Sequence, residues 1–63
     1  MRPEDEKIAR AVALLHAFEG DFQKARHASA QADDLIDSRQ WQIADARYLR
    51  ECRRAAEQAV AEA

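Results

Sequence analysis

Apolar residues recur along the first third of the chain at the spacing of an α-helix. At 100° per residue they share one arc, which consists of Ile8, Ala11, Val12, Leu14, Leu15 and Phe18. Pro3 suits a first helical position, where its missing N–H would have no partner, and three acidic residues follow it at the positive end of the helix. The pattern predicts a helix over residues 3–19 with one buried face.

The only glycine of the chain, Gly20, follows this helix and is followed by Asp21. A glycine adopts positive φ without a steric penalty and commonly ends a helix, whereas an aspartate caps the start of the next one. The next helix is predicted over residues 22–36, and its inner face contains mostly small residues: Phe22, Ala25, Ser29, Ala32 and Ile36. Because the connection is short, the two helices should form an antiparallel hairpin.

A third helix is predicted over residues 38–62, beginning after Asp37. Asp37 and Gln40 have the spacing of a capping box, in which each side chain bonds the backbone of the other residue. The alternative is a two-helix hairpin with a long second helix, because neither glycine nor proline occurs between Asp21 and Ala63. Such a helix could not bury its far half within one chain and would have to dimerise. The predicted fold is therefore all-α: a single domain, residues 1–63, built as a small three-helix unit.

The third helix has two contrasting faces. An apolar arc, widened by Leu49 and Val60, contains Trp41, Ala44, Tyr48, Cys52, Ala55, Ala56 and Ala59, and is predicted to pack in the core. The opposite face carries Arg47, Arg50 and Arg54, with Ile43 beside them. This arginine ridge is either a solvated face or a partner-binding surface in which Ile43 is the apolar anchor. The acidic residues Asp33, Asp34 and Asp37 are the alternative binding surface.

The length and composition set limits on stability and location. A chain of 63 residues buries only about 60% of its unfolded surface, and most of its apolar residues beyond thirteen bulky ones are alanines. Its single cysteine excludes an internal disulfide, so a second copy or another protein is the expected supplement to the core. The acidic start of the chain and the short apolar run before Glu19 do not resemble a signal peptide or a membrane span. We therefore expect a cytoplasmic protein.

Candidate chemistry is sparse. The chain contains two histidines, His16 and His27, and one cysteine, Cys52. No pair of these residues has the spacing of a zinc site. Cys52 has no evident base beside it, and its position in the apolar arc predicts core packing rather than nucleophilic catalysis. The chain contains no phosphate-binding glycine loop. We therefore expect no enzymatic activity, catalytic residue, metal or cofactor.

Residues 6–39 resemble one tetratricopeptide (TPR) motif, a helix–turn–helix of about 34 residues. The resemblance rests on G-D-F-x-x-A at the turn and on alanines at the small-residue positions 13, 25 and 32. The sequence departs from the motif at Ala9, His16 and Ser29, where large or aromatic residues are usual, and at Asp37, where the closing proline would stand. The resemblance implies a hairpin that binds another protein; an unrelated three-helix unit is the competing interpretation.

Three function classes are compatible with this sequence. The first is a non-enzymatic protein-interaction module: an adaptor, a co-chaperone-like hairpin or a small inhibitor, such as phages and mobile elements encode. The second is a nucleic-acid contact protein, against which the net charge of −2 argues. The third is a structural subunit of a homo-oligomer. We expect the first, with another protein or a second copy as the partner.

Overall fold

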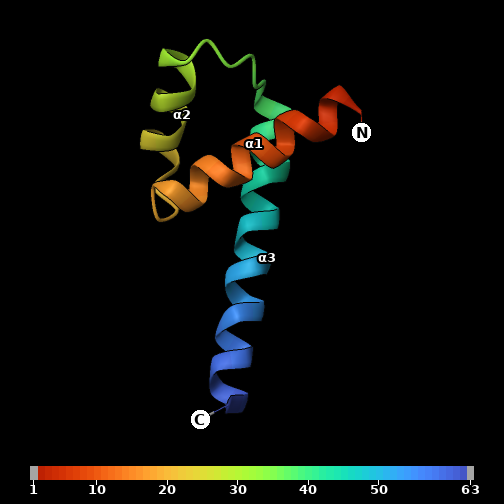
Figure 1. Ribbon diagram of the computed structural model, residues 1–63, viewed down its shortest axis with the longest axis vertical. Helices are drawn as coiled ribbons and strands as arrows, with labels where there is room; N and C mark the ends of the chain where they lie inside the picture. The colour runs from red at the N-terminus through yellow and green to blue at the C-terminus, as the bar shows by residue number, and fades with distance from the viewer. Residues whose placement is uncertain (1, 63) are drawn as a thin grey trace.

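The computed structural model describes residues 2–62, which form three helices: α1 (Pro3–Ala17), α2 (Phe22–Gln31) and α3 (Ser38–Glu62). No strand occurs in this part of the chain. The predicted all-α, three-helix architecture is confirmed. The alternative of one long helix after Asp21 is wrong, because residues 32–37 leave the helical path between α2 and α3 (Figure 1).

Helix α1 ends two residues earlier than predicted. The Gly20 N–H donates to the Leu15 carbonyl at 2.7 Å, and the Glu19 N–H donates to the His16 carbonyl at 3.2 Å. This pair of bonds is a Schellman motif, which requires a left-handed residue just after the helix. Glu19 occupies that position with φ 55°, and Gly20 follows with φ 83°. The predicted positive φ of Gly20 is confirmed, but the left-handed turn begins one residue before it.

Helix α2 begins as predicted and ends five residues early. At its start the Lys24 N–H donates to the Asp21 carboxylate at 3.1 Å, as expected of a cap. At its end Asp33 takes φ 56°, and the Asp34 N–H donates to the Ser29 carbonyl at 3.0 Å. Aspartate tolerates the left-handed region better than most residues, and continuing the helix would leave acidic side chains at its negative end. The chain therefore turns away before Ile36.

Helix α3 begins where the sequence predicted, because its capping box forms. The Gln40 N–H donates to the Asp37 carboxylate, and the Asp37 N–H donates to the Gln40 side-chain oxygen, both at 3.0 Å. The bond to Asp37 explains how Gln40 is buried at only 6% exposure without leaving its amide oxygen unpaired. The break between α2 and α3 is therefore fixed by local hydrogen bonds.

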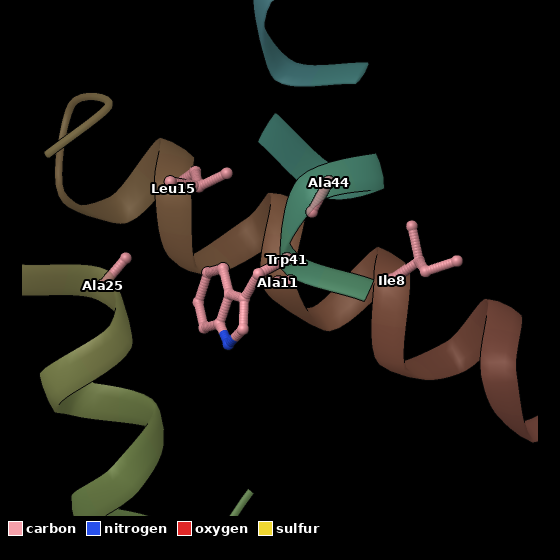
Figure 2. Close-up of a cluster of buried hydrophobic side chains, with 6 residues drawn as sticks. All are labelled: Ile8, Ala11, Leu15, Ala25, Trp41 and Ala44. Atoms are coloured by element: carbon pink, nitrogen blue, oxygen red, sulfur yellow. The ribbon is translucent and has the colours of Figure 1, made fainter. Parts of the chain in front are cut away.

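The core lies where the first turns of α3 meet α1 and α2. Its buried apolar residues are Ile8, Ala11, Leu15, Ala25, Trp41 and Ala44. Figure 2 shows the Trp41 indole extending from α3 into the space between α1 and α2. The indole meets the Phe22 ring edge-to-face, with ring centroids 5.5 Å apart. Buried Ala25 and Ser29 give α2 a small inner face as the sequence predicted, whereas Ala32, which was also predicted to lie on it, is exposed just past the end of the helix.

The closest packing is between α1 and α3, and α1 lies across the first half of α3 rather than along it (Figure 1). Residues 49–62 of α3 therefore project beyond the core, and all of them are exposed. We call this segment the arm. The predicted core packing of its apolar residues is wrong, because neither α1 nor α2 extends far enough to cover them: Leu49, Cys52, Ala55, Ala56, Ala59 and Val60. No helix in residues 2–62 has the length and apolar character needed to cross a membrane.

Candidate functional site

The arm is the part of this fold that is available for contact on every side. Its 14 residues continue a helix whose first turns are anchored in the core by Trp41 and Ala44. At 1.5 Å per residue the arm is about 21 Å long. Two of its large apolar side chains are open to solvent, with Leu49 59% and Val60 78% exposed. The fold thus presents a helical segment that is exposed along its whole length and that contacts α1 at its base, where Glu51 pairs with His16.

The arginine ridge lies where α3 leaves the core. Arg47, Arg50 and Arg54 are all exposed, as predicted, and with Glu51 they line a shallow hollow of about 170 Å³. Ile43 does not project freely beside them: it is half-buried and packs against the core cluster. The structure therefore brings the three guanidinium groups together on one surface, with only the outer part of Ile43 available to a partner.

The second half of α1 contacts the start of the arm through polar and aromatic groups. His16 Nε2 lies 2.7 Å from Glu51 Oε2, and the His16 ring meets the Tyr48 ring edge-to-face at 4.8 Å between centroids. Both members of the His16–Glu51 pair have half-exposed side chains, so solvent screens the pair. The sequence did not reveal this pairing, because the two residues are 35 positions apart.

Tyr48 and Cys52 lie one turn apart on α3 and influence each other. Hydrogen bonding to the Cys52 side chain, partial burial and the nearby negative charges of a Cys52 thiolate and Glu19 all raise the pKa of Tyr48 above its ordinary 10.0. Cys52 itself is exposed rather than packed in the core, which corrects the sequence-based prediction. No cluster of three or more histidine, cysteine or acidic side chains suited to a metal occurs within residues 2–62.

The alternative acidic surface does not form one patch of free carboxylates. Asp34 accepts from Arg10 Nε at 3.1 Å and thereby ties the α2–α3 connection to α1. Asp37 caps α3, and Asp33 occupies the left-handed position at the end of α2. Two of the three carboxylates thus have partners within the chain. The acidic cluster is less available to another protein than the arginine ridge.

A further open hollow of about 450 Å³ lies along the outer side of α2, and sequence reasoning did not identify it. Phe18, Lys24 and His27 contribute to its lining. His27 is exposed there, as its position opposite the inner face of α2 predicts. The hollow contains no cluster of converging polar groups that would define a reaction or a ligand.

No family model matches the sequence, and neither the curated proteins nor the solved structures contain a match to it. The resemblance to a TPR hairpin therefore stays a prediction.

Proposed function

We propose that this protein is a non-enzymatic protein-interaction module, an adaptor or a small inhibitor that occupies the surface of another protein. The single observation that carries the proposal is the arm, a continuous α-helical segment held clear of the core with every residue exposed. Most of the stability of a helix in a protein comes from tertiary packing rather than from intrinsic propensity. A partner that packs on the arm would supply the contacts that the chain itself does not.

The arginine ridge supports a proposal for the chemistry of that partner. Arg47, Arg50 and Arg54 occur at spacings of three and four, so their guanidinium groups follow one face over about two helical turns. A guanidinium binds a carboxylate through two parallel hydrogen bonds, which fixes orientation as well as charge. The partner surface we propose is acidic, with carboxylates spaced along a helix or a groove of similar length.

A phosphate backbone also attracts arginines, so nucleic acid is the competing ligand. The net charge of −2 for the whole chain argues against it, since non-specific nucleic-acid binding depends on many cationic contacts. An acidic protein surface needs only the few contacts that the ridge provides. We therefore place the protein-interaction function first.

Capture experiments with a matched pair of variants test the proposal. Arg47→Gln/Arg50→Gln/Arg54→Gln removes the ridge charges, whereas Arg2→Gln/Arg26→Gln/Arg39→Gln removes the same number of charges from exposed arginines elsewhere. All six positions are on the surface, although the Arg26 guanidinium also lies 5.5 Å from the centroid of the Phe22 ring. The free energy of unfolding of each variant should therefore lie within about 1 kcal/mol of the wild-type value. Both variants and the wild type serve as bait in a lysate of the native host, with and without nuclease treatment.

The proposal expects proteins that the wild type and the control variant retain and the ridge variant loses, in nuclease-treated lysate as well. Equal retention by all three baits would show that the ridge is only a solvated face. A loss seen only without nuclease treatment would assign the ridge to nucleic acid instead.

A further inference from the structure

The side of the arm away from the arginine ridge carries an apolar stripe that is open to solvent. We define the stripe as Leu49, Cys52, Ala56 and Val60, which follow one another at spacings of three, four and four. At 100° per residue these positions fall within an arc of about 80°, nearly opposite the ridge. All four are exposed. The stripe and the ridge are therefore separate surfaces of one helix.

The charges along α3 are self-complementary in one orientation. Residues 47–54 contain four arginines and one glutamate, net +3, whereas residues 55–62 contain two glutamates and no cation, net −2. Arg47, Arg50 and Arg54 lie on the ridge and face away from the stripe, so in an antiparallel pair they attract the acidic half of the other helix only at long range. Arg53 and Glu57 flank the stripe on one side, and when Leu49 faces Val60 the Arg53 of each copy lies within about one residue of the level of Glu57 in the other. The two helix dipoles then point in opposite directions, so the positive end of each helix lies near the negative end of the other. A parallel pair would place the two basic halves side by side and the two acidic halves side by side.

The shape of the molecule permits the same arrangement. Helices α1 and α2 both lie at one end of α3, and the arm extends from the other end (Figure 1). Two antiparallel arms therefore place the two cores at opposite ends of the pair, whereas parallel arms would crowd both cores at one end. Cys52 and Ala56, near the middle of the arm, are small enough for the helix axes to approach closely.

We infer that this chain forms an antiparallel homodimer in which the apolar stripes of two arms pack against each other. This inference goes beyond the proposed function, because it uses the opposite side of the arm and leaves both ridges facing outward. The dimer buries Leu49 and Val60 of both copies and gives each arm the tertiary contacts that a single chain lacks. Since half of the stripe is small, we expect association in the micromolar range.

Sedimentation velocity of the full chain across the micromolar range tests the dimer, with far-UV circular dichroism to monitor folding. The wild type should shift from monomer to dimer as concentration rises. Leu49→Gln/Val60→Gln should weaken association by at least about tenfold, since it replaces both large residues of the stripe. Leu35→Gln is the matched control: Leu35 is 81% exposed but lies in the α2–α3 connection, so this variant should dimerise like the wild type.

A strictly monomeric wild type would overturn the inference, and so would a dimer that Leu49→Gln/Val60→Gln leaves intact. Either result leaves the ridge proposal standing, because the capture experiment tests that surface separately.

The orientation of the arms has its own test. Glu57→Gln/Glu62→Gln removes the acidic half of the arm and should weaken an antiparallel dimer, even though it also lowers the overall negative charge that keeps two copies apart. In a parallel dimer the same change relieves repulsion and would tighten association. Tighter association would therefore overturn the antiparallel arrangement.

Discussion

Gly20 is the residue whose replacement should be most informative about the turn between α1 and α2. It holds φ 83°, and a Cβ added to it would lie 2.9 Å from Tyr48 Cε1 and 3.0 Å from the Tyr48 hydroxyl. Two independent penalties therefore act on Gly20→Ala. One is the left-handed backbone, which is unfavourable for alanine, and the other is the contact with the Tyr48 ring.

The backbone penalty is the larger of the two. A left-handed conformation costs an L-residue about 1–2 kcal/mol. The Tyr48 ring is the far end of a half-buried side chain and can move, but its movement weakens the edge-to-face contact with His16, worth about 0.5–1.5 kcal/mol when well packed. Because the His16 side chain is half exposed, we take the lower end of this energy range for the contact between the His16 and Tyr48 rings. We expect Gly20→Ala to lower the free energy of unfolding by about 2 kcal/mol.

Urea unfolding measures this change. Trp41 is the only tryptophan and is buried, so its fluorescence reports the core, and circular dichroism reports the helices. Gly20→Asn is the matched control, because asparagine also adds a Cβ but tolerates positive φ better than alanine. If the backbone dominates, the asparagine variant should lose clearly less stability than the alanine variant.

If Gly20→Ala and Gly20→Asn lowered the free energy of unfolding equally, the contact with Tyr48, and not the backbone conformation, would be the main penalty. If Gly20→Ala were as stable as the wild type or more stable, residue 20 could not hold a left-handed conformation, and the turn described here would be wrong.

Three further changes test the cap, the core and the Tyr48–Cys52 contact. Asp37→Ala removes the capping box and should cost about 1 kcal/mol in urea unfolding; an unchanged midpoint would mean that the box contributes nothing to the start of α3. Trp41→Ala should cost about 3–5 kcal/mol, enough to leave much of the protein unfolded by circular dichroism, whereas a native-like spectrum and melt would place the core elsewhere. Tyr48, the only tyrosine, should titrate above pH 10.0 by ultraviolet absorbance, and Cys52→Ala should bring the midpoint back toward that value. Because folding raises the pKa of Tyr48, the stability that this shift contributes is present below pH 10 and is lost as the pH rises through the raised pKa of the folded protein. A wild-type titration midpoint at or below 10.0 would refute the contact between Tyr48 and Cys52.

Helix starts could be predicted from the sequence, but two of the three helix ends could not. The helix starts are marked by side chains that act on the next few residues: Pro3, Asp21 and Asp37. Because this effect is local, it can be predicted from the sequence. The ends of α1 and α2 depend on Glu19 and Asp33 adopting positive φ. Neither residue requires that conformation, and the hydrogen bonds that stabilise it form only once the turn is made.

The faces of α3 were predictable, but the length of helix that would be covered was not. Trp41, Ala44 and Tyr48 pack against the rest of the chain as the apolar arc predicted, whereas Cys52, one turn further along, is exposed. Hydrophobic periodicity indicates which side of a helix is apolar. It does not indicate the angle at which a neighbouring helix crosses, and that angle decides where burial stops.

The candidate surface was predictable to a similar extent. The ridge follows from helical spacing alone, so the exposure of Arg47, Arg50 and Arg54 was expected and is observed. The half-burial of Ile43 and the pairing of Asp34 with Arg10, 24 positions away, depend on where α1 and the α2–α3 connection lie. Contacts between segments distant in sequence account for these two differences, whereas the capping role of Asp37 follows from its local spacing with Gln40.

The contacts at the C-terminal end of α1 also determine how the arm can meet another helix. Tyr48 lies beside Gly20, and Glu51 pairs with His16, so two successive turns of α3 are held just where the arm begins. The exposed His16–Glu51 contact adds at most about 1 kcal/mol to stability, but it lies at the base of the arm, next to the point where α3 leaves the core. An arm held in one direction loses less freedom on binding than a mobile one, and preorganisation of this kind strengthens association. The turn at Gly20 thus affects the proposed binding surfaces as well as the fold, since it brings His16 and the space for the Tyr48 ring to the base of the arm.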